Sequence, residues 1–207
     1  MSKVTVIGTG NIGSAVALIA AKGGADVQLL GRDQEKTAAV AEQAGASAGR
    51  VGDAIEGDIV VLAVPYAALV ELATQYSDQL GGKTLVDVTN PLDFATFDSL
   101  TVPADSSAAA ELQALVPAAK VVKAFNTNFA ATLASGQIGA NDTTVLVAGD
   151  DDSAKQALVD VITAGGVNAV AAGSLKRARE LEALGFLQLT LGAQGIIGWT
   201  GGFAVQK

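Results

Sequence analysis

Near its amino terminus the sequence carries glycines in the spacing G-x-G-x-x-G, at Gly8, Gly10 and Gly13. A short, apolar, β-branched run at residues 4–7 stands before them, and a helix-like stretch of small residues at 11–22 follows. A strand, a glycine turn and a helix in this order are typical of a βαβ unit that holds the pyrophosphate of a dinucleotide. This feature therefore predicts an α/β fold with a nucleotide site at its first turn.

Each glycine has its own expected role in such a turn. Gly8 permits the tight turn, Gly10 lets the backbone approach the pyrophosphate, and Gly13 lets the helix pack close to the strand. The anion would lie beside Asn11 and Ile12, where the N–H groups of a helix N-terminus and the helix dipole favour negative charge. The alternative interpretation is that the glycines only shape a turn.

The rest of the chain alternates short β-rich runs with longer, Ala-rich stretches. This alternation predicts right-handed βαβ units and a Rossmann-type, doubly wound, mostly parallel sheet, with two extra strands and a helix at the C-terminal end. We expect one domain spanning residues 1–207, with a short C-terminal extension from about residue 143. Strands are expected at 4–7, 27–30, 59–64, 84–88, 121–124, 143–148 and 167–171, with a weaker one at 47–51, and helices at 11–22, 34–44, 67–79, 108–115, 152–164 and 175–191. Residues 95–107 are expected to form an irregular loop, and the glycine-rich end of the chain has no assigned shape.

Composition excludes several classes of function. The chain has 13 Lys and Arg against 21 Asp and Glu, a net charge of -8, which argues against nucleic-acid or anionic-membrane binding. It has no cysteine and no histidine, so thiolate chemistry, the commonest general base and the commonest transition-metal ligand are absent, and no metal site is expected. The first expected strand leaves no room for a signal peptide, and no apolar run is long enough to span a bilayer, so we expect a cytoplasmic protein.

The residues after the second expected strand indicate which dinucleotide is bound. NAD sites usually place Asp or Glu there to bind the ribose, whereas this chain has Gly31 followed by Arg32. Arginine suits a 2′-phosphate, and Lys36, a cation in the first turn of a helix, opposes the dipole unless an anion binds there. With the hydroxyl of Thr9 inside the glycine turn, these residues favour NADP over NAD.

Two alternatives apply to this cofactor assignment. Arg32 and Lys36 are also compatible with a solvated helix face. Asp33 is placed where it could bind the ribose of NAD, although we expect it to be the N-cap of the helix that starts at residue 34.

Beyond the glycine turn, the chain contains in order the stretches VTVIGTGNIGSAVA, GRDQEK, DIVVLAVPYAAL, LVDVTNP and KVVKAFNT. With this spacing they resemble the NADPH-dependent reductases of the deazaflavin coenzyme F420 and related NADP oxidoreductases, over nearly the whole chain. The resemblance implies hydride transfer between NADP(H) and a flavin-like ring, with the residues at Thr9, Arg32 and Lys36 holding the 2′-phosphate. Gly31 departs from the small hydroxyl residue that the family pattern implies, and the glycine-rich C-terminus is a second departure. The resemblance and the apolar final helix together imply a homodimer.

Ligands of open α/β sheets bind beyond the carboxyl ends of the strands. The residues there are mostly polar and uncharged, which suits a nicotinamide ring and a planar heterocycle. Asn90 and Asn126 can each donate and accept hydrogen bonds, as a carboxamide requires, or can simply cap turns. Tyr66 can stack on a ring or be an ordinary half-buried aromatic. The expected cofactor-binding set at the sheet edge is Ala63, Val64, Pro65, Asn90 and Asn126, with Thr89, Pro91, Phe125 and Thr127 as neighbours.

The absence of histidine and cysteine also constrains the reaction. Hydride transfer to a flavin-like ring requires positioning rather than an acid–base pair, so Tyr66, Asn90 and Asn126 are expected only to position the rings. A ketone or imine substrate would need a proton donor, for which Tyr66, Lys123 and Asp93 are the candidates. The alternatives are therefore an NADPH-dependent flavin or ferric reductase, a small imine or ketone reductase, and a non-catalytic NADP(H) sensor.

Overall fold

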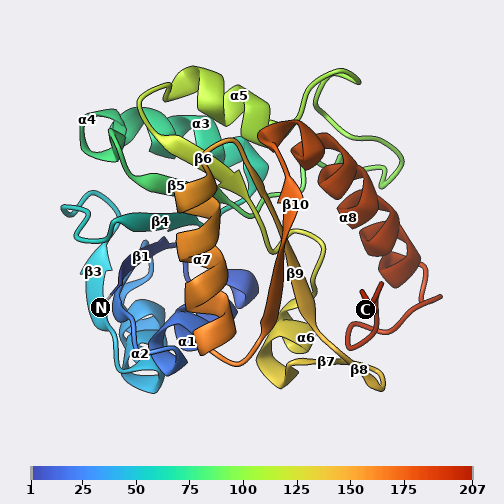
Figure 1. Ribbon diagram of the computed structural model, residues 1–207, viewed down its shortest axis with the longest axis horizontal. Helices are drawn as coiled ribbons and strands as arrows, with labels where there is room; N and C mark the ends of the chain where they lie inside the picture. The colour runs from blue at the N-terminus through green and yellow to red at the C-terminus, as the bar shows by residue number, and fades with distance from the viewer. Residues whose placement is uncertain (1, 207) are drawn as a thin grey trace.

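The centre of the protein is a twisted eight-stranded β-sheet, shown in the computed structural model of Figure 1, which describes residues 2–206. The strand order is β10-β9-β6-β5-β4-β1-β2-β3. The strands are β1 (Lys3–Ile7), β2 (Asp26–Gly31), β3 (Ser47–Arg50), β4 (Ile59–Leu62), β5 (Thr84–Asp87), β6 (Lys120–Lys123), β9 (Thr144–Gly149) and β10 (Asn168–Gly173). The weak strand expected at 47–51 is thus confirmed as β3.

The direction of the strands divides the sheet into two parts. β1 to β6 are parallel, whereas β9 runs antiparallel to β6 and β10 runs parallel to β9. The chain leaves β3 at one edge and returns to β4 beside β1, so the strand order reverses between β1 and β4. This switch point is where doubly wound sheets bind ligands, and the two extra strands are as the sequence predicts.

Helices cover both faces of the sheet. One face is covered by α1 (Asn11–Lys22), α2 (Gln34–Ala44), α6 (Ala130–Ser135) and α7 (Asp152–Ala164), and Figure 1 shows α7 lying across it. The other is covered by α3 (Tyr66–Gln75), α4 (Ser77–Leu80), α5 (Ala108–Leu115), a 3₁₀ turn at Leu175–Arg177 and the start of α8 (Ala178–Ala193).

The apolar side chains of the strands divide between these two layers. In β4, Ile59 and Val61 pack into the first cluster, and Val60 and Leu62 pack into the second. Because both faces are covered, the strand is apolar at every position rather than at alternate ones.

Two expected helices differ from the structure. The helix expected at 67–79 divides at Tyr76, whose fully buried hydroxyl accepts a hydrogen bond from the Gly52 N–H (2.6 Å). The helix expected at 175–191 begins as the 3₁₀ turn and continues through Ala193. The two helical stretches lie where the sequence predicts them, and their observed ends at Tyr66, Leu80 and Ala193 are one or two residues beyond the predicted ones.

Three short elements were not predicted: α6 and the hairpin of β7 (Gln137–Ile138) and β8 (Asn141–Asp142). Elements this short do not show the periodic spacing of apolar residues by which helices and strands are recognised in a sequence. The glycine-rich end of the chain turns back along α8, where the Phe203 N–H donates to Gln188 Oε1 (3.0 Å). Among the described residues, no helix is long and apolar enough to cross a membrane.

Candidate active site

The three glycines of the first turn occupy different environments. Gly8 has a φ of 113°, and a Cβ there would collide with the Ala63 carbonyl oxygen. A Cβ on Gly13 would collide with the Gly8 carbonyl oxygen, whereas one on Gly10 would meet nothing within 4 Å. Gly8 and Gly13 therefore shape the turn itself, and Gly10 keeps the space in front of α1 open.

The N-terminus of α1 faces this open space. Gly10 is its N-cap, no side chain caps the helix and its first turn contains no acidic residue. The first N–H groups of a helix have no partner within the helix, and together with the dipole they attract an anion. The turn thus has the room and the donors that a pyrophosphate requires.

A cavity of about 420 Å³ opens beside the turn, and we call it the N-terminal cavity. It brings together residues that follow β1, β2 and β4, as the sequence predicts for a site at the switch point. Its lining comprises Gly8, Thr9, Gly10, Arg32, Asp33, Lys36, Val51, Ala63, Val64, Pro65, Ala68, Glu71, Leu72 and Gln75.

Three of the four charged residues that line this cavity, Arg32, Asp33 and Lys36, lie at the start of α2, and the fourth, Glu71, lies on α3. The Asp33 carboxylate accepts from the Lys36 N–H (3.1 Å), which confirms that Asp33 is the N-cap of α2. The side chains of Arg32 and Lys36 are exposed and enter no ion pair in the described part of the chain. Two cations therefore border the cavity, together with two carboxylates: Asp33, which already accepts a hydrogen bond, and Glu71 on α3.

Gly31 is required by its packing. A Cβ at this position would collide with the Thr37 hydroxyl and lie 2.9 Å from Thr9 Cγ2. Thr37 is fully buried, and its hydroxyl donates to the Asp33 carbonyl oxygen (2.5 Å). The departure from a hydroxyl residue at position 31 thus has a steric cause in this chain.

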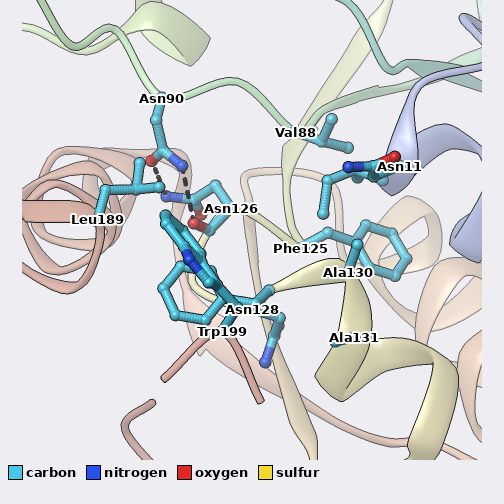
Figure 2. A pocket seen from close by; sticks show the side chains of 12 residues that line it. Asn11, Val88, Asn90, Phe125, Asn126, Asn128, Ala130, Ala131, Leu189 and Trp199 are labelled. Carbon is cyan, nitrogen blue, oxygen red and sulfur yellow. Dashed lines mark hydrogen bonds between the residues drawn. The ribbon is translucent and has the colours of Figure 1, made fainter. Parts of the chain in front are cut away.

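A second cavity, of about 370 Å³, is lined in part by Asn11 and Ile12, which follow Gly10 in the glycine turn. Figure 2 shows this cavity from close by, with Asn11 labelled. We call it the C-terminal cavity. It is lined by Asn11, Ile12, Val88, Asn90, Phe125, Asn126, Asn128, Phe129, Ala130, Ala131, Leu189 and Trp199. None of these side chains ionises.

Two amides form a pair at the edge of the C-terminal cavity, as the dashed lines in Figure 2 mark. Asn90 Nδ2 donates to the Asn126 carbonyl oxygen (2.9 Å), and Asn126 Nδ2 donates to Asn90 Oδ1 (3.0 Å) and to the Leu181 carbonyl oxygen (2.9 Å). Asn126 Oδ1 is buried and has no hydrogen-bond partner among the described residues. It is therefore an acceptor whose hydrogen bond is not made by the protein, as is the buried Asn128 Oδ1, another lining residue of this cavity.

The backbone that carries Asn126 is strained. Phe125 has a φ of 65°, in the left-handed region that a non-glycine residue rarely adopts, and the Asn126 N–H donates to the Ala124 carbonyl oxygen (2.9 Å). This forms a tight three-residue turn at the end of β6. Strain of this kind persists only where the surrounding structure holds it, and it is concentrated at functional sites.

Behind the amide pair lies a fully buried charge cluster. Lys123 Nζ contacts Asp87 Oδ2 (2.8 Å) and Glu182 Oε1 (2.8 Å), and donates to the Thr89 carbonyl oxygen (2.6 Å). Burial raises the pKa of Glu182 above its ordinary value, although the Lys123 ammonium opposes this shift. Through Lys123 the cluster fixes the backbone of Thr89, the residue before Asn90. It also links β5, β6 and α8, which carry Asp87, Lys123 and Glu182.

The three candidate proton donors lie outside the C-terminal cavity. Lys123 is enclosed in the charge cluster, and Asp93 is half-buried and accepts from the Ala95 N–H (2.9 Å). The Tyr66 hydroxyl donates to Glu111 Oε2 (2.5 Å) and lies in a separate cavity of about 160 Å³. The structure thus separates Tyr66 from Asn90 and Asn126, with which the sequence groups it.

Sequence reasoning missed the aromatic wall of the C-terminal cavity. The rings of Phe129 and Trp199 lie 4.9 Å apart, and α8 contributes Leu189. Trp199 is the only tryptophan, in an otherwise glycine-rich tail, which was the one available signal.

Comparisons with known proteins extend over both cavities. The family described as NADP oxidoreductase, coenzyme F420-dependent, matches residues 3–91. The F420-dependent NADP reductase of Methanocaldococcus jannaschii is 31% identical over 199 residues, 88% of each chain, and that of Methanothermobacter thermautotrophicus is 32% identical over 206 residues, 91% of this chain and 88% of the other. The crystal structure of a proposed F420-dependent NADP reductase from Arthrobacter sp. FB24 superimposes with a TM-score of 0.86 at 28% identity, over 100% of both chains.

Proposed function

Because this chain belongs to the family of coenzyme F420-dependent NADP oxidoreductases, we propose that it transfers hydride between NADP(H) and a flavin-like acceptor, with the deazaflavin coenzyme F420 as the preferred one. The assignment to NADP-dependent oxidoreductases follows from the family. The identity of the acceptor is the proposal, and it is supported by the chemistry of the C-terminal cavity.

The N-terminal cavity fits the phosphate-bearing part of NADP(H). Gly10 and the first turn of α1 would hold the pyrophosphate, and Thr9, Arg32 and Lys36 would hold the 2′-phosphate. When bound, the nicotinamide ring supplies or accepts the hydride.

The C-terminal cavity fits two planar rings in contact. Asn126 Oδ1 would accept from the carboxamide of the nicotinamide, and the Asn90–Asn126 pair fixes the direction of that acceptor. Phe129 and Trp199 offer apolar faces to a tricyclic ring.

The observation that carries the proposal is that no ionisable side chain lines the C-terminal cavity. A flavin-like acceptor needs alignment with the hydride donor, whereas a ketone or imine needs a placed proton donor. These side chains therefore suit ring-to-ring hydride transfer better than carbonyl or imine reduction.

The direct test is the oxidation of NADPH with coenzyme F420, FMN, FAD, a cyclic imine or a ketone as acceptor, followed by absorbance. We expect turnover with F420, slower turnover with flavins and none with the imine or ketone. Faster turnover of the imine or ketone would refute the proposal. Tight NADPH binding without turnover of any acceptor would favour a sensor.

Arg32→Ala tests the cofactor half of the proposal. Losing a charge-assisted bond should weaken NADP⁺ binding by about 1.5–3 kcal/mol and leave NAD⁺ binding nearly unchanged. Calorimetric titration of both cofactors into both proteins measures this. Equal or tighter NAD⁺ binding by the unmodified protein would contradict the preference for NADP.

We also propose that the protein is a homodimer. The proposal is supported by several large apolar side chains that are exposed toward the C-terminal end of the chain, one on α8 and the others after it. They are Leu187, Ile196, Trp199, Phe203 and Val205. Light scattering coupled to size-exclusion chromatography should give twice the chain mass, and the mass of a single chain would refute this proposal.

A further inference from the structure

A groove of about 380 Å³ lies at the carboxyl ends of β2 and β3, next to the N-terminal cavity. It is lined by Gly31, Arg32, Gln34, Arg50 and Val51. Arg32 and Val51 line both the groove and the N-terminal cavity, so the two spaces adjoin. Two arginines line the groove. Arg32 already has a role in the proposed cofactor site, whereas Arg50 has none so far.

The register of the sheet brings Arg50 beside the 2′-phosphate residues. β2 and β3 are parallel, and Gly31 at the end of β2 pairs with Arg50 at the end of β3. Arg32 follows Gly31 directly, so the two arginines flank the position at which the chain has no side chain. The carboxyl end of the second strand is where doubly wound folds bind the ribose of a dinucleotide.

The polar groups around Arg50 leave its guanidinium available. The Asp53 carboxylate accepts from the Arg50 backbone N–H (2.7 Å), and Gln34 Nε2 donates to the Gly31 carbonyl oxygen (3.0 Å). The Arg50 side chain is exposed and enters no ion pair within residues 2–206. Asp33, the other nearby carboxylate, caps α2.

The packing around Gly31 leaves this position unable to contribute a phosphate-binding side chain. A side chain at position 31 would collide with Thr37, so no hydroxyl can reach a phosphate from there. A phosphate group offers several acceptor oxygens, and a guanidinium binds two of them through its planar fork. A second guanidinium on the far side of Gly31 can make the contact that position 31 does not.

We propose that Arg50 binds the 2′-phosphate of NADP(H) together with Arg32, and so helps this chain discriminate NADP from NAD. The inference rests on the proposed use of NADP(H) and adds to it a specificity residue from β3, outside the glycine turn and the β2–α2 junction.

The test uses two probes that differ only in the 2′-phosphate, adenosine 2′,5′-bisphosphate and AMP, titrated calorimetrically. Arg50→Ala should weaken binding of the bisphosphate about tenfold or more, the loss of one charge-assisted bond, and change AMP affinity less than about twofold. Arg50→Lys should fall between, since a lysine keeps the charge and loses the fork. Arg179→Ala, on the exposed start of α8, changes the net charge equally and should leave both affinities unaltered.

The outcomes separate this inference from the proposed function. If Arg50→Ala weakens both probes equally, Arg50 contacts adenine or ribose, and the inference is overturned; it is overturned equally if neither probe is affected. In both cases a selective loss of bisphosphate binding in Arg32→Ala would leave the NADP assignment standing. If the unmodified protein does not prefer the bisphosphate, both the inference and the NADP assignment fail. Thermal unfolding of each variant verifies that the fold is retained.

Discussion

The N-terminal and C-terminal cavities flank the same helix N-terminus, yet they are built in opposite ways. The N-terminal cavity is lined by residues 8–75, mostly at turns that follow β1, β2 and β4, and it is bordered by exposed cations. The C-terminal cavity collects residues from α1, from the ends of β5 and β6, from α6, from α8 and from the tail, and it has no ionisable lining. The proposed phosphate site is thus built from local, charged, solvent-facing groups, whereas the proposed ring site is built from segments that are far apart in the sequence.

The support behind each cavity differs in the same way. The N-terminal cavity depends on two close approaches of backbone, between Gly8 and the Ala63 carbonyl group and between Gly13 and the Gly8 carbonyl group. The C-terminal cavity depends on the amide pair and on the buried cluster of Lys123 with Asp87 and Glu182. Variants at these positions test how much each support contributes.

The largest effect is expected at Lys123. Lys123→Met leaves two buried carboxylates without their cation, which should cost about 3–5 kcal/mol in the free energy of unfolding. Urea unfolding followed by circular dichroism measures this. Lys120→Met is the matched control, since Lys120 begins the same strand and forms a partly exposed ion pair with Asp151 (3.1 Å), so its loss should be far smaller.

This outcome also decides how a slow Lys123 variant is interpreted. If Lys123→Met is destabilised as expected, a lower rate reflects a disturbed C-terminal cavity rather than a lost proton donor. A variant of unchanged stability would show that the cluster does not support this side of the molecule.

A smaller effect is expected from the paired variants Gly13→Ala and Gly10→Ala. A Cβ on Gly13 overpacks the turn against Gly8 and should cost about 1–3 kcal/mol of stability. A Cβ on Gly10 has room, so stability should be nearly unchanged while NADP⁺ affinity falls about tenfold or more, because the new methyl group occupies the approach of the pyrophosphate. Thermal unfolding and cofactor titration of both variants measure the two effects.

The glycine comparison fails if Gly10→Ala keeps its NADP⁺ affinity. The open space in front of α1 would then serve no ligand, and the glycines would only shape the turn.

The smallest effect is expected at Tyr66, which lies in neither large cavity. Tyr66→Phe removes the hydrogen bond to Glu111, and the rate of hydride transfer should change less than about twofold. Burial and the Glu111 carboxylate raise the pKa of Tyr66 above its ordinary value, so the hydroxyl keeps its proton throughout the neutral range. Single-turnover rates of both proteins should therefore be flat around neutral pH, apart from ionisations of the cofactors. A loss of about 10²–10⁴-fold would instead identify Tyr66 as an acid–base group and the reaction as carbonyl or imine reduction.

Local chemistry explains why several elements could be predicted from sequence. The helices α1, α2, α5 and α7 have the predicted bounds, and three of them start at side-chain N-caps, Asp33, Ser107 and Asp151. Such caps depend on residues a few positions apart. By contrast, α6 and the β7–β8 hairpin are stabilised by their surroundings and carry no period of their own.

The candidate site divides in the same manner. Most of the residues expected around the glycine turn and after β2 and β4 line the N-terminal cavity, because one motif and the strand ends that follow it contain them. Asn11 and Ile12 line the C-terminal cavity instead, Gly31 lines an adjoining groove, and Gly13 packs against Gly8. Asn90 and Asn126 could be named from the strand-end rule, but their mutual hydrogen bonds could not. Tyr66 was grouped with them by the same rule, although the start of α3 carries it to Glu111 instead.

The sequence by itself determined the βαβ order, the doubly wound sheet, the glycine turn with the cations that follow β2, and the lack of histidine and cysteine for catalysis. All of these depend on residue type and on spacing along the chain. Only the tertiary structure decided that Lys123 is buried between two carboxylates, that Trp199 and Phe129 close the C-terminal cavity, and that Arg50 stands beside Gly31. Each of these depends on contacts between segments far apart in sequence, and such contacts arise only when the packing of the whole sheet and its helices brings those segments together.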